Sequence, residues 1–181
     1  MTETYQKYVD NISKIDKIKR LFWFVVSIFL FRPFGLPIFN SWRIFLLQCF
    51  GAKIDKGSIV YSSTYIPAPW QLTMGKHSAL GPYVKLHFGK TIIGSKVTVS
   101  QRSYLCSATH DSKNLNLPFK AGTIIIEDFV WIAAEAFIIA NITLKEGCVI
   151  AARSAVFEDV EPYTIVRGNP AKFLKNRELI D

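Results

Sequence analysis

Histidine, cysteine and long apolar runs are all scarce in this chain of 181 residues. Its three cysteines cannot form a full set of disulfides, so we expect reduced thiols and a cytoplasmic protein. The longest apolar run, residues 21–31, is only about half as long as the roughly 20 residues that a membrane-spanning helix needs. Glycine (10) and proline (8) are at ordinary levels, which excludes collagen-like and low-complexity classes.

Acidic residues are also few, with 14 Asp and Glu against 22 Lys and Arg and a net charge of +8. Residues 1–53 hold eight of the bases and three of the acids, so this segment alone contributes +5. Its bases are interleaved with Phe and Leu rather than arrayed on a polar face, which argues against a nucleic-acid partner. Half of the chain is apolar and a fifth is charged, the composition of a folded domain.

Two apolar stretches, residues 21–31 and 42–50, dominate the N-terminal segment 1–53. Pro33 and Pro37 separate them, so we expect two short helices, and the absence of a small-residue cleavage site after the first argues against export. Two interpretations stay open. The helices pack on the main domain or on a neighbouring subunit, or they lie peripherally in the anionic headgroup layer of the inner membrane, with Trp23 and Trp42 at the interface.

From residue 54 onward, an aliphatic residue recurs at intervals of six. Neither the 3.6-residue period of a helix nor the two-residue alternation of an ordinary β-sandwich gives this spacing, so the repeat governs the fold. Two short insertions and one long interruption shift the series, which then resumes. Its fifteen members are Ile54, Val60, Ile66, Met74, Leu80, Leu86, Ile93, Val99, Leu105, Ile126, Ile132, Ile138, Leu144, Ile150 and Val156.

A six-residue period is typical of a triangular coil, in which each side is a short strand with one aliphatic residue pointing inward. Residues 54–160 then form roughly five to six coils stacked about 4.8 Å apart, an all-β solenoid of parallel strands. Residues 111–122 fall outside the register and are predicted to form an excursion loop, where function tends to concentrate. Residues 161–181 are expected to cap the open end, with 173–181 as a short helix.

Five motifs give the chain a family resemblance. These are the hexapeptide period with its excursion, and the segments LCSATHD (105–111), VWIAAEAF (130–137), VIAARSAV (149–156) and GNPAK (168–172). Together they resemble the hexapeptide-repeat acyltransferases. The stretch SWRIFLLQCFGAKI (41–54), the pair Pro69-Trp70 and the Cys-x-x-x-His-Asp arrangement at 106–111 are similar to the colanic acid biosynthesis acetyltransferase branch. The resemblance spans residues 32–175.

This resemblance implies properties that composition and spacing do not give. The family has a left-handed parallel β-helix, an exception to the usual right-handed crossover, and it works as a homotrimer with active sites between neighbouring prisms. It uses acetyl-CoA as donor, a sugar hydroxyl of an exopolysaccharide, capsule or related glycan intermediate as acceptor, and no metal. Transfer is direct, without a covalent acyl-enzyme.

Acetyl transfer to a hydroxyl needs a general base, and an imidazole suits this role near neutral pH. His110 stands immediately before the excursion and matches the family's catalytic histidine. Asp111 follows it, but adjacent residues of an extended strand point to opposite sides. We therefore expect Asp111 to anchor the loop on the acceptor side, and a backbone carbonyl to orient His110.

Other acceptor and nucleophile candidates lie nearby in the sequence. His87 stands where relatives often have an Asn in the acceptor pocket, and a sugar contact or a plain exposed histidine are equally acceptable interpretations. Tyr83 is a weaker candidate of the same kind. Cys106, four residues before His110, raises the alternative of an acyl-cysteine intermediate, which the family's direct transfer disfavours.

For the donor, Trp131 matches the Trp that lines the pantetheine arm of CoA. The pairs Ala133-Ala134 and Ala151-Ala152 are small enough to let the arm approach the backbone. The basic candidates for the nucleotide phosphates are Arg153, Arg167, Lys172 and Lys175. One departure weakens this assignment, because many relatives have Thr-Lys where this chain has Phe157-Glu158.

Two competing functions use the same fold. A γ-type carbonic anhydrase shares three histidines across subunits to bind zinc, but the three histidines here are ten and twenty-three residues apart. A non-catalytic scaffold at the inner membrane is the other alternative, suggested by Glu158 and by the N-terminal segment.

Overall fold

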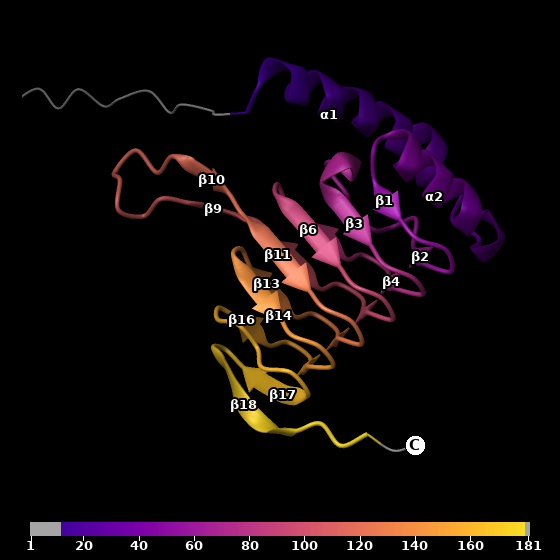
Figure 1. Cartoon of the computed structure of the whole chain (residues 1–181). Coiled ribbons are helices and arrows are strands. Elements are labelled where there is room, and N and C mark those ends of the chain that lie inside the picture. Colours follow the sequence, from indigo (N-terminus) through magenta and orange to yellow (C-terminus); the bar gives the residue numbers. More distant parts are fainter. Residues whose placement is uncertain (1–11, 180–181) are drawn as a thin grey trace, which may run out of the picture.

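The structure is a computed structural model that describes residues 12–179. It shows a three-sided prism of short strands with helices at its N-terminal end (Figure 1). The chain passes repeatedly through three sheets in the same order, which we name A, B and C. Within each sheet, strands from successive turns of the chain pair in parallel, as the six-residue period predicts.

The strands are mostly two to four residues long. Sheet A contains β1 (Lys53–Ile54), β3 (Leu72–Met74), β6 (Lys90–Ile93), β11 (Thr123–Ile126) and β14 (Ile142–Leu144). Sheet B contains β2 (Ile59–Val60), β4 (Ala79–Leu80), β7 (Thr98–Val99), β12 (Trp131–Ile132), β15 (Val149–Ile150), β17 (Thr164–Gly168) and β18 (Ala171–Asn176). Sheet C contains β5 (Lys85–Leu86), β8 (Tyr104–Cys106), β13 (Phe137–Ile139) and β16 (Ala155–Val156).

The interior of the prism is built from the aliphatic residues of the repeat. All fifteen are buried, none more than 6% exposed, so the predicted inward set is confirmed. Register stacks them into columns, for example Val99 on Ile132 and Ile132 on Ile150 along sheet B. Because burying one such side chain contributes about 1.5–3 kcal/mol, the stacked columns are the main source of stability of the coils.

The corners between sheets B and C repeat one local conformation. Arg102 and Glu135, for example, have left-handed backbone with φ of 60° and 62°. The next residue is small and buried, Ser103 in one coil and Ala136 in the next. The Ser103 hydroxyl donates to the carbonyl of Ala133 at 2.9 Å, which ties neighbouring coils together at this corner.

The excursion contains more regular structure than the predicted loop. β9 (Ala108–His110) and β10 (Phe119–Ala121) pair antiparallel, and the hairpin projects sideways from the prism (Figure 1). The expectation of a loop over the whole of 111–122 was therefore wrong for residues 119–121. Pairing with β9 satisfies backbone groups that would otherwise need water.

The predicted C-terminal helix is also wrong. Residues 171–176 form β18, which runs antiparallel to β17 after a turn at Asn169 and Pro170. β17 would otherwise leave one row of backbone donors and acceptors unpaired at the end of sheet B, and β18 covers that row. The cap of the open end is thus a hairpin, extending from the last parallel strand of the solenoid.

Helices cover the opposite end of the prism (Figure 1). They are α1 (Lys14–Val26), the π-helical turn η1 (Ser27–Phe31), the 3-10 turn η2 (Pro37–Phe39) and α2 (Asn40–Cys49); a further 3-10 turn, η3 (Pro69–Gln71), precedes β3. We call residues 14–50 the helical cap. None of the helices within residues 12–179 is long and apolar enough to cross a membrane.

One face of the helical cap packs on the coils. Trp23 and Phe31 are 3% and 2% exposed, and the Trp23 indole donates to the carbonyl of Ile66 at 2.5 Å. Arg43 is buried and donates to the carbonyls of Val60 and Phe34, and its burial lowers the pKa of the guanidinium. The burial interpretation therefore holds for this face, whereas other apolar residues of the cap are exposed.

Candidate functional site

The candidate site residues lie on two different edges of the prism. The edge between sheets C and A includes residues 87–89 and 107–122, and we call it the histidine edge. The edge between sheets B and C includes residues 81–84, 100–103, 133–136 and 151–154, and we call it the alanine edge. Most acceptor-side candidates lie on the first edge. Of the donor candidates, the two alanine pairs and Arg153 lie on the second.

His110 ends strand β9 at the base of the excursion and is exposed to solvent. Its Nδ1 lies 2.6 Å from the carbonyl oxygen of Leu117, across the hairpin. A carbonyl oxygen can only accept, so Nδ1 carries the proton and Nε2 keeps its lone pair. The ring also contacts Phe119 edge to face, with centroids 6.0 Å apart. The imidazole is therefore held in the tautomer that a base acting through Nε2 needs.

Asp111 has other partners than His110. It forms an ion pair with Lys120 at 2.8 Å and accepts from the backbone N–H of Lys113 at 3.0 Å. The hydrogen bond from Lys120, with that from Lys113, lowers the pKa of the Asp111 carboxyl. These contacts tie the tip of the excursion to β10, which is the anchoring position expected for this residue.

His87 lies on the same edge as His110, at the end of β5. It is half-buried and contacts the rings of Phe88 and Tyr104 edge to face, at 5.0 and 5.8 Å. Burial lowers the pKa of His87, and the charges of Arg20 and His110 lower it further. A neutral imidazole at this position can donate a hydrogen bond to a hydroxyl group through one ring nitrogen and accept one through the other.

Tyr83 is not brought together with these residues. It stands at the other end of β5, on the alanine edge, and is 59% exposed. Its left-handed backbone, with φ of 59°, is that of the corner residues Arg102 and Glu135. Within one chain, Tyr83 therefore occupies a corner position rather than a place beside His110.

The donor candidates do come together. A shallow groove of about 560 Å³ runs along the alanine edge and the outer face of sheet B. The Trp131 side chain is 47% exposed there, and its indole N–H donates to the hydroxyl of Ser100 at 3.1 Å. The lining includes both predicted alanine pairs: Ser100, Gln101, Trp131, Ala133, Ala134, Val149, Ala151, Ala152 and Ile165.

The basic candidates are divided between two places. Arg153 lies next to Ala152 at the groove and forms an ion pair with Glu135 at 2.7 Å. Lys175 of β18 stands opposite Ile165 of β17, which lines the groove. Lys172 stands opposite Arg167 in the register of β18 and β17, and it lines a separate pocket of about 370 Å³ at the end of the prism.

That separate pocket is rich in carboxylates. Glu158, Asp159 and Glu161 all line it together with Lys172. Glu158 is one of the two residues at which the chain departs from its relatives. It lines the same pocket as Lys172, the cation expected to bind phosphate. The structure thus assigns Lys175 and Arg153, rather than Lys172, to the immediate surroundings of the groove.

The three cysteines differ in environment and none is disulfide-bonded. Cys106 is half-buried, and its S–H donates to the carbonyl of Ala108 at 3.3 Å. Cys148 is buried in the interior, which raises the pKa of its thiol to about 12. Neither environment is that of the electropositive, exposed sites in which thiolates become nucleophiles.

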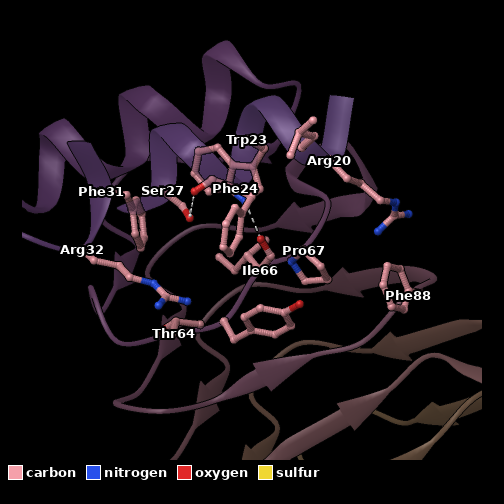
Figure 2. A pocket seen from close by; sticks show the side chains of 12 residues that line it. Arg20, Trp23, Phe24, Ser27, Phe31, Arg32, Thr64, Ile66, Pro67 and Phe88 are labelled. Atoms are coloured by element: carbon pink, nitrogen blue, oxygen red, sulfur yellow. Dashed lines mark hydrogen bonds between the residues drawn. The ribbon is translucent and has the colours of Figure 1, made fainter. Parts of the chain in front are cut away.

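A further cavity of about 260 Å³ lies beneath α1, between the helical cap and sheet C. Figure 2 shows Arg32 and Thr64 at one end and Arg20 and Phe88 at the other. Arg20 pairs with Asp16 at 2.6 Å and lies over the ring of Phe88 at 4.4 Å. Its Nη1 is buried and finds no hydrogen-bond partner among residues 12–179. Because Phe88 adjoins His87, this guanidinium belongs to the surroundings of the histidine edge.

Several residues of the site had no signal in the sequence. The Leu117 carbonyl is set by the shape of the hairpin, and Arg20 comes from a helix 67 residues before His87. Ser100 could have been predicted to line the groove, because it occupies the same position in its coil as Ala133 does in the next one. Tyr104 is brought to His87, and Phe119 to His110, only by strand pairing, whereas Phe88 adjoins His87 in the sequence.

Residues 12–179 contain no group of three or more His, Cys, Asp or Glu side chains arranged to hold a metal ion. His77 lies on the third edge, between β3 and β4, away from the other two histidines.

Comparison with known proteins places this geometry in a family. No family model matches the chain. It is 36% identical over 165 residues to the "Putative colanic acid biosynthesis acetyltransferase WcaF" of Escherichia coli, covering 90% of this chain and 89% of that protein. A hexapeptide-repeat acetyltransferase from Vibrio cholerae, solved with acetyl coenzyme A, superposes with a TM-score of 0.80 at 22% identity, covering 95% of this chain and 94% of the other.

A maltose O-acetyltransferase from Clostridium difficile 630 has the same fold, with a TM-score of 0.78 at 20% identity, over 92% of this chain and 90% of that one. These two solved structures support the fold, and the sequence relative supports the family. Together with the confirmed six-residue register, they show that this chain belongs to the hexapeptide-repeat acetyltransferases, in the branch of the colanic acid biosynthesis acetyltransferases.

Proposed function

We propose that this protein transfers the acetyl group of acetyl-CoA to a sugar hydroxyl of an exopolysaccharide, capsule or related glycan intermediate. The observation that carries this proposal is the His110 imidazole, held by the Leu117 carbonyl so that Nε2 is available as a base. The colanic acid acetyltransferase relative and the maltose O-acetyltransferase fold neighbour both favour a sugar acceptor. Acetyl-CoA as donor and three unpaired cysteines favour action in the cytoplasm.

The chemistry follows from the tautomer of His110. The acceptor hydroxyl oxygen attacks the thioester carbonyl while Nε2 takes its proton. The tetrahedral intermediate then collapses, the C–S bond breaks, and the imidazolium returns the proton to the departing CoA sulfur. The Leu117 carbonyl stays hydrogen-bonded to Nδ1–H throughout, so the ring keeps its orientation as charge develops.

Neighbours on the histidine edge would bind the acceptor. His87, kept neutral by its surroundings, can hydrogen-bond a sugar hydroxyl. The Nη1 of Arg20, which has no hydrogen-bond partner among residues 12–179, is a further donor on this side. Asp111 acts through the excursion by holding the loop against Lys120.

The groove on the alanine edge would bind the donor. Trp131 would pack against the pantetheine arm, and Ala134 and Ala152 would let its amides reach the backbone. Arg153 and Lys175 are the cations best placed for the nucleotide phosphates, with Lys172 further away beside Glu158.

The separation of the two edges supports a homotrimer. Within one chain, His110 and the Trp131 groove occupy different corners of the triangular cross-section. An acetyl group bound in the groove of one chain can reach the His110 of a second chain when the two prisms stand side by side. We therefore propose a cyclic trimer with three sites between neighbouring chains. We also infer a left-handed sense of coiling from the family.

The direct test is turnover with purified protein. Acetyl-CoA and candidate sugar acceptors should release free CoA thiol, and mass spectrometry should find the acetylated sugar. Comparing the producing cell's surface polysaccharide with and without this protein identifies the acceptor. No thiol release with any glycan, and no change in the polysaccharide, would instead support the non-catalytic scaffold.

The shared site is tested by mixing chains. Ala152 lines the groove and is exposed, so Ala152→Phe obstructs the donor without disturbing the interior. Chains carrying only Ala152→Phe or only His110→Ala should be inactive. Equal co-assembly of the two should restore about a quarter of the wild-type activity, since one junction in four then pairs an intact groove with an intact histidine. No restoration in verified mixed trimers would place both edges of one site in a single chain.

A further inference from the structure

We propose that the outer face of the helical cap docks on the surface of an anionic lipid bilayer. α1 and η1 are apolar on two sides. One side packs Trp23 and Phe31 against the coils. The other exposes large apolar side chains that are between 45% and 68% accessible: Ile18, Leu21, Phe22, Val25 and Phe29.

The exposed apolar surface continues onto the second part of the cap. The Trp42 indole donates to the carbonyl of Leu30, which fixes α2 beside η1. Trp42 and Phe45 contact each other with ring centroids 5.9 Å apart and remain 36% and 53% exposed. Leu36 and Ile38, in the connection between the helices, are 62% and 78% exposed. Contiguous apolar surface of this kind marks an interaction site.

The charges around this surface are positive. Lys14 and Lys17 are exposed at the start of α1, whereas Lys19 lies over the ring of Trp70 at 5.9 Å and Arg32 lines the cavity beneath α1. Asp16 is the only acid between residues 12 and 54. It is held by Arg20 at 2.6 Å and by the Trp70 indole at 3.1 Å, on the side of α1 that faces the coils. The outward surface therefore combines apolar side chains with a local excess of positive charge.

This combination identifies the occupant. A second copy seated face to face would bring the same lysines against one another, which like-charge repulsion opposes. Anionic lipid headgroups attract these lysines, and the acyl region accepts the Phe and Leu side chains. α1 is 13 residues long, about 20 Å, so it cannot cross the hydrocarbon layer and lies along the surface.

Sedimentation with lipid vesicles tests the proposal. The full chain should pellet with vesicles of phosphatidylcholine and phosphatidylglycerol, bind pure phosphatidylcholine vesicles more weakly, and be partly released by high salt because screening weakens the attraction. Phe22→Ser with Phe29→Ser should reduce binding at least about tenfold. Lys14→Glu with Lys17→Glu should abolish the preference for anionic vesicles.

A matched control comes from the opposite end of the prism. Phe173 and Leu174 of β18 are also exposed, at 63% and 39%, so Phe173→Ser with Leu174→Ser should leave vesicle binding unchanged. Circular dichroism and thermal unfolding verify that each variant is folded. The proposal is overturned if the wild-type chain does not bind anionic vesicles, or if folded Phe22/Phe29 variants bind as well as wild type. Self-association that those variants abolish, without vesicle binding, would identify a second copy as the occupant.

Discussion

The two functional edges of the prism are built in different ways. On the alanine edge, each coil turns with the same short corner, a left-handed residue followed by a small buried one, as at Glu135-Ala136 and Arg153-Ser154. On the histidine edge the connections vary in length, from two residues after β13 to the hairpin that follows β8. The alanine edge is thus a regular surface, whereas the histidine edge is a set of connections that differ from coil to coil.

This difference relates structure to role. A regular edge with small side chains forms a continuous groove, which suits a long donor that is the same for every member of the family. Irregular connections place individual side chains such as His87 and His110 and can change without disturbing the aliphatic columns. Loops on a rigid scaffold are where specificity tends to reside. We therefore expect substitutions on the histidine edge to affect chemistry and acceptor choice, and those on the alanine edge to affect the donor.

The largest effect is expected for His110→Ala. Loss of the general base should lower turnover by about 10² to 10⁴, with little change in the KM for acetyl-CoA, because the groove lies on the other edge. The exposed position of His110 predicts an unchanged unfolding temperature. Steady-state kinetics and thermal unfolding check both statements.

The control for this variant is His77→Asn. His77 is exposed on the third edge with φ of 58°, a conformation that Asn tolerates. It should keep full activity. Equal losses in the two variants would indicate a general structural effect and remove His110 from its proposed role.

A smaller effect is expected for Trp131→Ala. Removing an aromatic contact of about 1–1.5 kcal/mol should raise the KM for acetyl-CoA by about tenfold and leave turnover nearly unchanged. Ile59→Ala is a matched control, since Ile59 is also exposed, at 46%, on an outward strand position of sheet B several coils away. A fall in turnover without a change in KM would contradict a donor-binding role.

The next prediction concerns the charge next to His87. Arg20 lowers the pKa of His87 by unfavourable interaction with the imidazolium, so Arg20→Met should raise that pKa while the larger effect of burial remains. Nuclear magnetic resonance titration of the histidine ring protons measures the shift. Lys19→Met, which removes an exposed cation of the same helix, is the control.

The sign of the stability effect follows. With its pKa lowered in the folded state, His87 takes up a proton more readily when unfolded, so its contribution to stability falls as the pH drops through the unfolded value of about 6.5. Arg20→Met should make this acid-dependent loss smaller. An unchanged His87 titration in the variant would show that Arg20 does not act on the site.

The sequence predicts the interior of this protein better than its edges. All fifteen residues of the six-residue series are buried, because each strand of the prism must bury at least one side chain, whatever the corners do. The series misses the second buried residue of some strands in sheet A, such as Leu72, Ile124 and Ile142. The place of Tyr83 on the alanine edge could not be predicted, because a place in the series does not show which edge is shared with His110. Its role on the acceptor side stays a prediction for the junction between two chains. The Leu117 carbonyl and Arg20 could not be predicted, since hairpin shape and helix packing bring them to the site.

The C-terminal error has a different cause. FLKN at 173–176 is too short for periodicity to distinguish a strand from a helix. The exposed edge of β17 decided the outcome, because pairing with β18 satisfies its backbone. Tertiary hydrogen bonding overrides local preference here, as it does in the excursion.

The smallest effect is expected for Cys106→Ala. Its thiol donates to the Ala108 carbonyl, and nothing in this contact activates it as a nucleophile, so direct transfer predicts a rate within about twofold of wild type. Incubation of the wild-type chain with acetyl-CoA alone should leave no acetyl adduct on Cys106 by mass spectrometry. An inactive Cys106 variant beside an active His110 variant, or a stable thioester on Cys106, would instead indicate an acyl-cysteine enzyme. In that mechanism the acetyl group passes first from the CoA sulfur to the Cys106 sulfur, and then from Cys106 to the acceptor hydroxyl.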